Sequence, residues 1–208
     1  MKKRVVLILV CIAVVVSIFL IKTGDKAENK VENTLEKSES VEEELVSLIL
    51  KGNLTKEQKK EMLALLPDVD WQKGSEIRID KNYDASSKIV DWLYSEAEGA
   101  NIKDADDILN VIKTYVDSNL DGAYTEGVSA ALGEIYIYDM ENFVKALHQI
   151  PEAIKDMASV LQFEGIYTVQ MHDVGEDMSL FLNSSILDEK EKKTGIQLLQ
   201  EYNALCNT

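Results

Sequence analysis

Residues 121–148 read DGAYTEGVSAALGEIYIYDMENFVKALH, and the spacing of their apolar side chains decides the fold class. Apolar and aromatic residues recur there at intervals of three and four, at Tyr124, Val128, Ala131, Ile135 and Tyr138. Such intervals place side chains on one face of an α-helix. Asp139 then interrupts the pattern as a helix-capping residue. A second stripe follows at Met140, Phe143, Val144 and Leu147, so the stretch predicts two consecutive helices joined almost directly.

The same helical pattern extends in both directions from this stretch. Ser40 with Glu43, and Thr55 with Gln58, each form a capping box, in which two side chains satisfy free N–H groups at a helix start. Further stripes predict helices over residues 40–52, 55–66, 84–99, 104–116, 151–165, 178–187 and 188–205, and a loop over residues 71–79.

The scarcity of turn residues and the short connections favour an all-α domain. The chain has only two prolines and ten glycines, fewer than an all-β chain of this length usually needs. Short connections make consecutive helices antiparallel neighbours. We expect residues 40–208 to form one domain of about eight short antiparallel helices in an irregular array. Successive pairs resemble the stacked pairs of HEAT-type solenoids, although no repeat can be aligned.

The N-terminal residues 1–22, MKKRVVLILVCIAVVVSIFLIK, have the pattern of a membrane anchor. Three cations precede an apolar run over residues 5–21, which nearly spans a hydrocarbon core of roughly 30 Å. The leading cations predict a cytoplasmic N-terminus and an extracytoplasmic C-terminal domain. A cleaved signal peptide, with secretion of the remainder, is the alternative, but no small-x-small cleavage site follows the run. Residues 23–39 are polar and charged and are interpreted as a tether.

The part of the chain after residue 22 is strongly acidic. It holds all 37 acidic residues and 18 of the 22 basic ones, so its formal charge is −19. Such a surface disfavours nucleic acid and anionic lipid and suits cationic partners or divalent ions. Arginine occurs only at positions 4 and 78, and this lysine-rich style is typical of a bacterial protein. Cys11 lies in the apolar run and Cys206 near the C-terminus, so no disulfide within the chain is expected.

The clearest candidate metal site is a calcium-type loop at Asp117, Asn119 and Asp121, followed by Gly122. Oxygen ligands at positions 1, 3 and 5 with glycine at position 6 are typical of a loop that wraps Ca²⁺. Position 12 should supply a bidentate carboxylate, and this chain has Val128 there. The alternative is a simple turn between two helices, with Asp121 capping the second. Calcium is the only cofactor that the sequence indicates.

No arrangement of residues indicates catalysis. Gly127-Val-Ser129-Ala-Ala131 resembles a nucleophile elbow, but helical spacing places Ser129 in mid-helix rather than on a strand-to-helix turn. The acidic cluster around His172 and Asp177 is interpreted as a solvated turn. We therefore expect a non-enzymatic, membrane-tethered helical module that binds a protein or peptide. A weak calcium-binding surface domain and an immunity-type protein that masks a toxin are the alternatives, and the sequence does not identify the partner.

Overall fold

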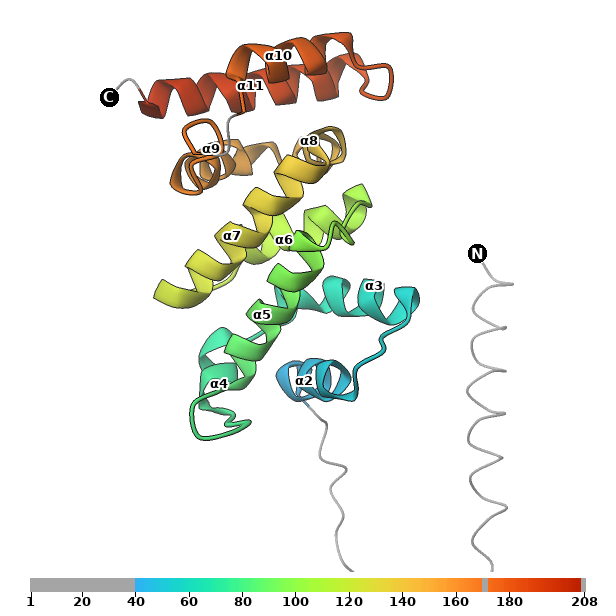
Figure 1. Ribbon diagram of the computed structural model, residues 1–208, viewed down its shortest axis with the longest axis vertical. Helices are drawn as coiled ribbons and strands as arrows, with labels where there is room; N and C mark the ends of the chain where they lie inside the picture. Colours follow the sequence, from blue (N-terminus) through green and yellow to red (C-terminus); the bar gives the residue numbers. More distant parts are fainter. Residues whose placement is uncertain (1–39, 170–171, 207–208) are drawn as a thin grey trace, which may run out of the picture. The chain divides into compact units, whose positions relative to one another are not determined.

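A computed structural model describes residues 40–169 and 172–206, and this part of the chain is helical (Figure 1). Within it lie ten α-helices, two 3-10 helices, an isolated bridge between Arg78 and Asp84, and no β-strand. The predicted all-α class is confirmed for these residues. In chain order the elements are α2 (Val41–Lys51), α3 (Lys56–Leu65), η1 (Leu66–Asp68), α4 (Trp71–Glu76), α5 (Ala85–Glu98), α6 (Ala105–Asp117), α7 (Gly122–Tyr138), α8 (Met140–His148), η2 (Pro151–Ala153), α9 (Ile154–Phe163), α10 (Val174–Asn183) and α11 (Glu189–Cys206).

The helices begin where the capping residues predict. At α2 the Ser40 hydroxyl accepts a hydrogen bond from the Glu43 N–H, and the Glu43 carboxylate accepts one from the Ser40 N–H. Thr55 and Gln58 make the same reciprocal pair at α3. The first N–H groups of a helix have no partner inside it, so such side chains fix the start of each helix. Other helices begin at an aspartate whose side chain accepts a backbone N–H, namely Asp70, Asp84, Asp104, Asp139 and Asp173.

Two layers of helices build the domain. Helices α5, α7, α9 and α11 pack one on the next, and α3, α6 and α8 pack in a parallel series beside them. Consecutive helices α6, α7 and α8 also contact one another, which links the layers. Figure 1 shows this progression from α2 at one end to α10 and α11 at the other. From α5 to α9, each α-helix therefore packs mainly on a helix two places away in the chain order, whereas α2 packs mainly on α5, α3 on α6, α4 on α5 and α10 on α11.

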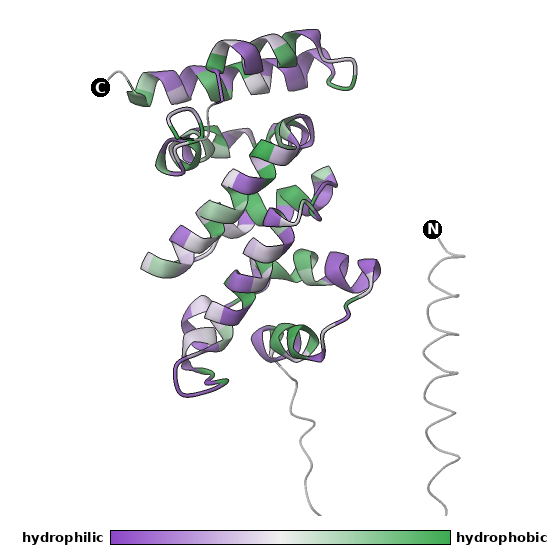
Figure 2. Ribbon diagram, in the orientation of Figure 1, coloured by the Kyte–Doolittle hydropathy of each residue, from purple (hydrophilic) through white to green (hydrophobic). Residues whose placement is uncertain are grey.

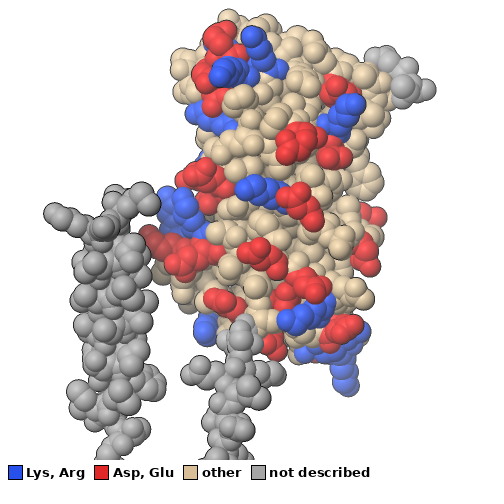
Figure 3. Space-filling view, turned by 180° about the vertical axis from the view of Figure 1, so that it is seen from behind, with Lys and Arg blue, Asp and Glu red and all other residues tan. Residues whose placement is uncertain are grey.

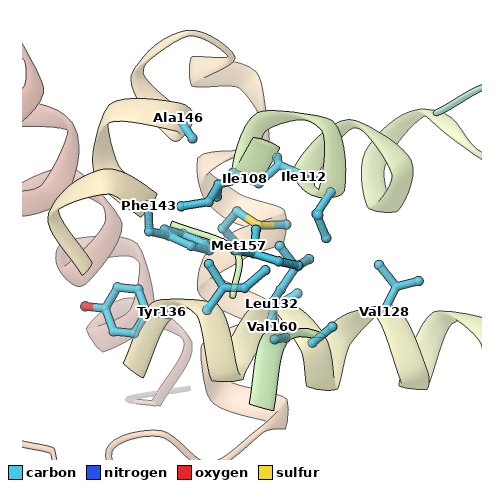
Figure 4. Close-up of a cluster of buried hydrophobic side chains, with 14 of the residues drawn as sticks. Ile108, Ile112, Val128, Leu132, Tyr136, Phe143, Ala146, Met157 and Val160 are labelled. Carbon is cyan, nitrogen blue, oxygen red and sulfur yellow. The ribbon is translucent and has the colours of Figure 1, made fainter. Parts of the chain in front are cut away.

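The core lies between the two layers, where four helices converge (Figure 4). Its labelled members are fully or almost fully buried, and burying each larger side chain contributes about 1.5–3 kcal/mol. The rings of Tyr136 and Phe143 meet edge to face, with centroids 5.3 Å apart and planes at 88°. In Figure 2 the hydrophobic residues follow the inward sides of the helices. The labelled residues are Ile108, Ile112, Val128, Leu132, Tyr136, Phe143, Ala146, Met157 and Val160.

The structure corrects several details of the sequence-based interpretation. Tyr138 was expected inward, but its side chain is 53% exposed; Val128, Ala131 and Ile135 are buried as predicted, and Leu132 and Tyr136 are buried as well. Helix α7 packs on both α5 and α9, so it is apolar on two sides. A single stripe of apolar residues at helical spacing therefore does not identify all of its buried residues. The described residues form ten α-helices rather than about eight, and α10 begins at Val174 rather than at Met178.

Helix α4 was expected as part of a loop. It has only six residues, WQKGSE, and Gly74 lowers its intrinsic helix propensity. The glycine is needed because α4 lies against the start of α5: a Cβ at Gly74 would lie 2.3 Å from the Ser86 hydroxyl oxygen. Ser86 in turn donates a hydrogen bond to the Trp71 carbonyl. Tertiary contact, which the local sequence does not reveal, therefore holds α4 in place.

The predicted membrane anchor over residues 5–21 and the predicted tether over residues 23–39 lie outside the described residues. Among the helices of residues 40–169 and 172–206, none combines the length and apolar character needed to cross a bilayer.

Candidate functional site

A cleft of about 1090 Å³ lies where the α3–α4 region meets the connection between α6 and α7. One wall comes from residues 67–76, with Ser87 of α5 beside them, and the other comes from residues 117–124. These two segments are more than forty residues apart in the chain and are joined by the packing of η1 on α6. We call this hollow the acidic cleft. Its lining residues are Pro67, Asp68, Val69, Asp70, Trp71, Gln72, Ser75, Glu76, Ser87, Asp117, Ser118, Asn119, Asp121, Ala123 and Tyr124.

Two aromatic side chains support the cleft. Trp71 begins α4 and is only 2% exposed, and its ring centroid lies 6.0 Å from that of Tyr124. The Tyr124 hydroxyl donates a hydrogen bond to Asp84 Oδ1 at 3.3 Å. Burial, and then the negative charge of Asp84, raise the pKa of Tyr124, so its hydroxyl remains a neutral donor at physiological pH. Tyr124, which is partly exposed, thus gives the cleft apolar area between its charged groups, and the buried Trp71 supports it from behind.

The cleft is negative throughout its lining. Five carboxylates line it and no lysine or arginine does; they belong to Asp68, Asp70, Glu76, Asp117 and Asp121. The ammonium group of Lys73, although on α4, lies 3.2 Å from the buried carboxylate of Glu42. A concave surface lined by one sign of charge concentrates the electric field and attracts ligands of opposite sign. The charge of the lining is therefore complementary to cations and unfavourable to phosphates or carboxylates.

The structure brings the predicted calcium residues Asp117, Asn119 and Asp121 to one wall of this cleft. Asp117 ends α6, Asp121 precedes α7 as its N-cap, and Gly122 has a positive φ of 29°. Val128, at the position of the closing ligand, is fully buried in the core and faces no loop. In residues 40–169 and 172–206, no group of three or more His, Cys, Asp or Glu side chains is arranged to hold a metal ion. Calcium binding stays a prediction.

The sequence alone did not identify the opposite wall of the cleft. Asp68, Asp70 and Glu76 lie about forty to fifty residues before Asp117, and only Glu76 falls in residues 71–79, which were expected to be a loop. The only sequence signal for these residues is the number of acidic residues close to Trp71. Their proximity to the α6–α7 connection depends on η1 packing against α6, which is a tertiary contact.

The other residues considered for chemistry have structural surroundings. Ser129 lies in the middle of α7, as helical spacing predicts, and is 3% exposed. The interpretation of the cluster at His172 as a solvated turn is wrong for Asp177, which is buried on α10. Its carboxylate accepts a hydrogen bond from the Tyr167 hydroxyl at 2.7 Å and lies 3.4 Å from His172 Nδ1. His148 Nδ1 lies 2.9 Å from the Thr194 hydroxyl.

Comparisons of this chain with protein-family models, with curated proteins and with solved structures each found no match. The function is therefore argued from the geometry and chemistry of the site.

Proposed function

We propose that this protein is a membrane-tethered binding module whose acidic cleft holds a basic segment of a protein or peptide partner. The observation that carries the proposal is the lining of the cleft, which has five carboxylates and no basic side chain. Lysine and arginine side chains would pair with these carboxylates, and their aliphatic stems would pack near Tyr124. Charge complementarity of this kind gives selectivity and fast association.

The size of the cleft favours a peptide segment over a single small molecule. Small-molecule pockets usually enclose about 300–1,000 Å³, and this cleft is slightly larger and open to solvent. No nucleophile with an adjacent base lines it, so the proposed role is binding without catalysis. Figure 3 shows acidic and basic side chains scattered over one face of the domain. An excess of acidic groups on a surface favours solubility and disfavours nucleic acid.

The proposed location follows from the N-terminal residues. Residues 5–21 would anchor the chain in the cell membrane as a single span, with Lys2, Lys3 and Arg4 on the cytoplasmic side. Residues 23–39 would then separate the helical domain from the outer surface. This placement would present the cleft to partners outside the cell, and secretion after cleavage of a signal peptide is the alternative.

Binding of a labelled octalysine peptide to the full-length protein, measured by fluorescence anisotropy, tests the proposal. The cleft variant Asp117→Asn/Asp121→Asn should weaken binding by roughly tenfold. Neither change removes a side-chain hydrogen bond to the backbone of a helix start, because Asp121 makes none and Asp117 ends its helix. A negative charge at a helix C-terminus is unfavourable, so the variant should remain folded.

The matched control is Glu61→Gln/Asp91→Asn, which has the same net charge. Both residues are exposed and lie outside the cleft lining. Its dissociation constant for octalysine should lie within about twofold of that of the unaltered protein, because salt screens the general effect of net charge. Equal weakening in the two variants would show that octalysine binds the acidic surface in general and would refute a cleft-specific site.

Calcium is the second candidate ligand, because Asp117, Asn119 and Asp121 share one wall of the cleft. Since the closing bidentate ligand is replaced by the buried Val128, we expect only weak affinity, on the order of 10⁻⁴–10⁻³ M. Calcium in excess over this value should raise the melting temperature relative to chelator, because a ligand of the folded state stabilises it. The Asp117→Asn/Asp121→Asn variant should lose this rise, and identical melts with calcium and chelator would exclude the site.

A further inference from the structure

A second pocket, of about 660 Å³, lies between α6, α7 and α9, and none of its lining residues lines the acidic cleft. Helix α7 contributes Gly122, Thr125, Glu126 and Ser129, which recur at intervals of three and four and so share one face. Helix α9 contributes Ser159, Gln162 and Phe163, with the same spacing, and α6 contributes Tyr115. The pocket is thus built on three packed helices rather than on loops, so its walls are fixed by the core.

The hydroxyl of Ser129 is the least explained polar group in this pocket. The residue is 3% exposed, and its Oγ has no hydrogen-bond partner among the described residues. The Oγ is itself buried, so a ligand in the pocket would pair with it after rotation of the Ser129 side chain about χ1. Serine and threonine inside helices usually donate to the carbonyl four residues earlier, as Thr114 does to Asn110 and Ser159 to Lys155. A buried hydroxyl without a partner destabilises a fold, so a site that keeps one calls for a ligand group that would pair with it.

The remaining lining residues indicate the chemistry of that ligand. Tyr115 and Phe163 offer two aromatic rings, and Phe163 is 68% exposed, which is unusual for a phenylalanine. Glu126 supplies a negative charge, and no lysine or arginine lines the pocket. Burial, and then the charges of Asp156 and Glu164, raise the pKa of Tyr115, so further carboxylates act on the same space. Aromatic rings and carboxylates together are how proteins recognise quaternary ammonium groups.

We propose that this pocket binds a small organic ammonium ligand that also carries a hydroxyl group, with the cation between Tyr115, Phe163 and Glu126 and the hydroxyl paired with Ser129. The ligand would occupy a site separate from the acidic cleft and would not depend on the basic-peptide function proposed above.

Choline and its neutral isostere 3,3-dimethylbutan-1-ol test the proposal, because they share shape and hydroxyl but only choline is charged. Binding of radiolabelled choline to the full-length protein is measured by equilibrium dialysis in dodecyl maltoside, a detergent without a choline headgroup. We expect saturable binding that the isostere displaces only at concentrations roughly tenfold or more higher. Absence of saturable binding, or displacement by the isostere at equal concentration, overturns the proposal.

Variants then locate the site. Ser129→Ala should weaken choline binding by roughly three- to tenfold while leaving the melting temperature of the ligand-free protein unchanged or higher, because it removes an unpaired buried hydroxyl. Phe163→Ala, at an exposed position, should weaken binding without unfolding the domain. The matched control Tyr138→Ala removes another exposed aromatic residue, outside the pocket, and should bind choline normally.

The cleft variant separates this site from the proposed function. Asp117→Asn/Asp121→Asn should bind choline as the unaltered protein does, and Ser129→Ala should bind octalysine normally. Loss of choline binding in the cleft variant, or unchanged choline affinity in both Ser129→Ala and Phe163→Ala, would show that the cation binds elsewhere and would refute the pocket assignment.

Discussion

Glu42, in the first turn of α2, is a buried carboxylate with 2% of its surface exposed. Its Oε1 accepts a hydrogen bond from the Asp70 N–H at 2.9 Å, and its Oε2 lies 3.2 Å from the Lys73 ammonium group. Burial alone would raise the pKa of Glu42, but the N–H of Asp70, the Ser40 hydroxyl and the nearby Lys73 ammonium group together lower it. One side chain thereby joins the start of α2 to the start of α4, beside the acidic cleft.

The substitution Glu42→Gln should destabilise the protein by about 1–3 kcal/mol near neutral pH, because it replaces a charged acceptor facing Lys73 with an amide. A carboxylate whose pKa is lower in the folded state contributes stability above its unfolded value of 4.5, and this contribution is lost as the pH falls through the folded value. Urea unfolding should therefore show a large difference between the two proteins near neutral pH and a small one near pH 3, and a constant difference would contradict the ionic explanation.

Glu134 on α7 shows the opposite effect. Burial raises its pKa first, and the nearby carboxylates of Glu98 and Glu164 raise it further. Stability conferred by a raised carboxylate pKa is present below the unfolded value and is lost as the pH rises through the folded value. Glu134→Gln should consequently raise the melting temperature near neutral pH, by roughly 1–3 °C, and have little effect in acid. Glu61→Gln, at an exposed position of α3, is the control and should leave the melting temperature unchanged both near neutral pH and in acid.

At this scale the sequence predicted what is local and missed what is long-range. Caps such as Ser40 and Asp139 were recognisable because both partners lie within three residues. Asp70 and Lys73, which hold Glu42 against α4, lie about thirty residues away, so its neighbours in the sequence do not distinguish it from the exposed Glu44. The acidic cleft shows the same limit. The sequence indicated a site at Asp117 on one wall, but it did not indicate Asp70 on the other wall, which only tertiary packing brings close.

At the scale of elements, a chain of hydrogen bonds joins α7, the turn after α9 and α10. The Tyr136 and Tyr167 hydroxyl oxygens are 2.6 Å apart, and Tyr167 donates to Asp177 Oδ2 at 2.7 Å. Since Tyr167 uses its proton on Asp177, Tyr136 donates to Tyr167. Burial raises the pKa of both tyrosines well above the ordinary value, which keeps both as donors. The Tyr167 ring also packs on Tyr202 of α11, with centroids 4.7 Å apart.

Replacing Tyr167 with Phe should remove the middle of this chain while keeping the ring contacts. We expect a loss of about 1–3 kcal/mol, because the buried Asp177 carboxylate would lose its shortest hydrogen bond. Hydrogen exchange should accelerate most in α10, which the chain fastens to the rest of the domain. Tyr138→Phe is the control, since Tyr138 is 53% exposed, and equal effects of the two changes would refute the role of the network.

The sequence predicted the presence of a helix wherever a long apolar stripe recurs at helical spacing. It predicted helix boundaries less well where tertiary contacts determine them. Helix α5 has its Asp84 cap, its Gly99 end and a buried stripe that includes Ile89 and Leu93, all as the spacing predicts. Helix α10 begins four residues before its predicted start, because Asp173 caps it and Asp177 is buried by the tyrosine network. A polar first turn that packs inward is not recognisable from hydrophobic spacing.

At the scale of the whole molecule, the two-layer stacking explains why the domain has two separate hollows, the acidic cleft and the pocket between α6, α7 and α9. The acidic cleft and the pocket between α6, α7 and α9 both include residues of the first turns of α7, yet share none. Between them runs the helix whose inner residues, among them Val128 and Leu132, are fully buried. Because α7 is fixed by packing on α5 and α9, a ligand at either site would meet preformed walls.

The predicted anchor makes a whole-molecule prediction about location. With Lys2, Lys3 and Arg4 before the apolar run over residues 5–21, a reporter fused after Thr208 should lie outside the cytoplasmic membrane. Alkaline phosphatase, which folds only in an oxidising compartment, should therefore be active there, and the fusion should sediment with membranes and resist extraction by high salt. Replacing Lys2, Lys3 and Arg4 with Glu should reduce or invert this orientation, because the charge bias that sets it is removed. Phosphatase activity in the soluble extracellular fraction would instead indicate cleavage of a signal peptide, and an inactive fusion recovered from the cytosol would refute the anchor.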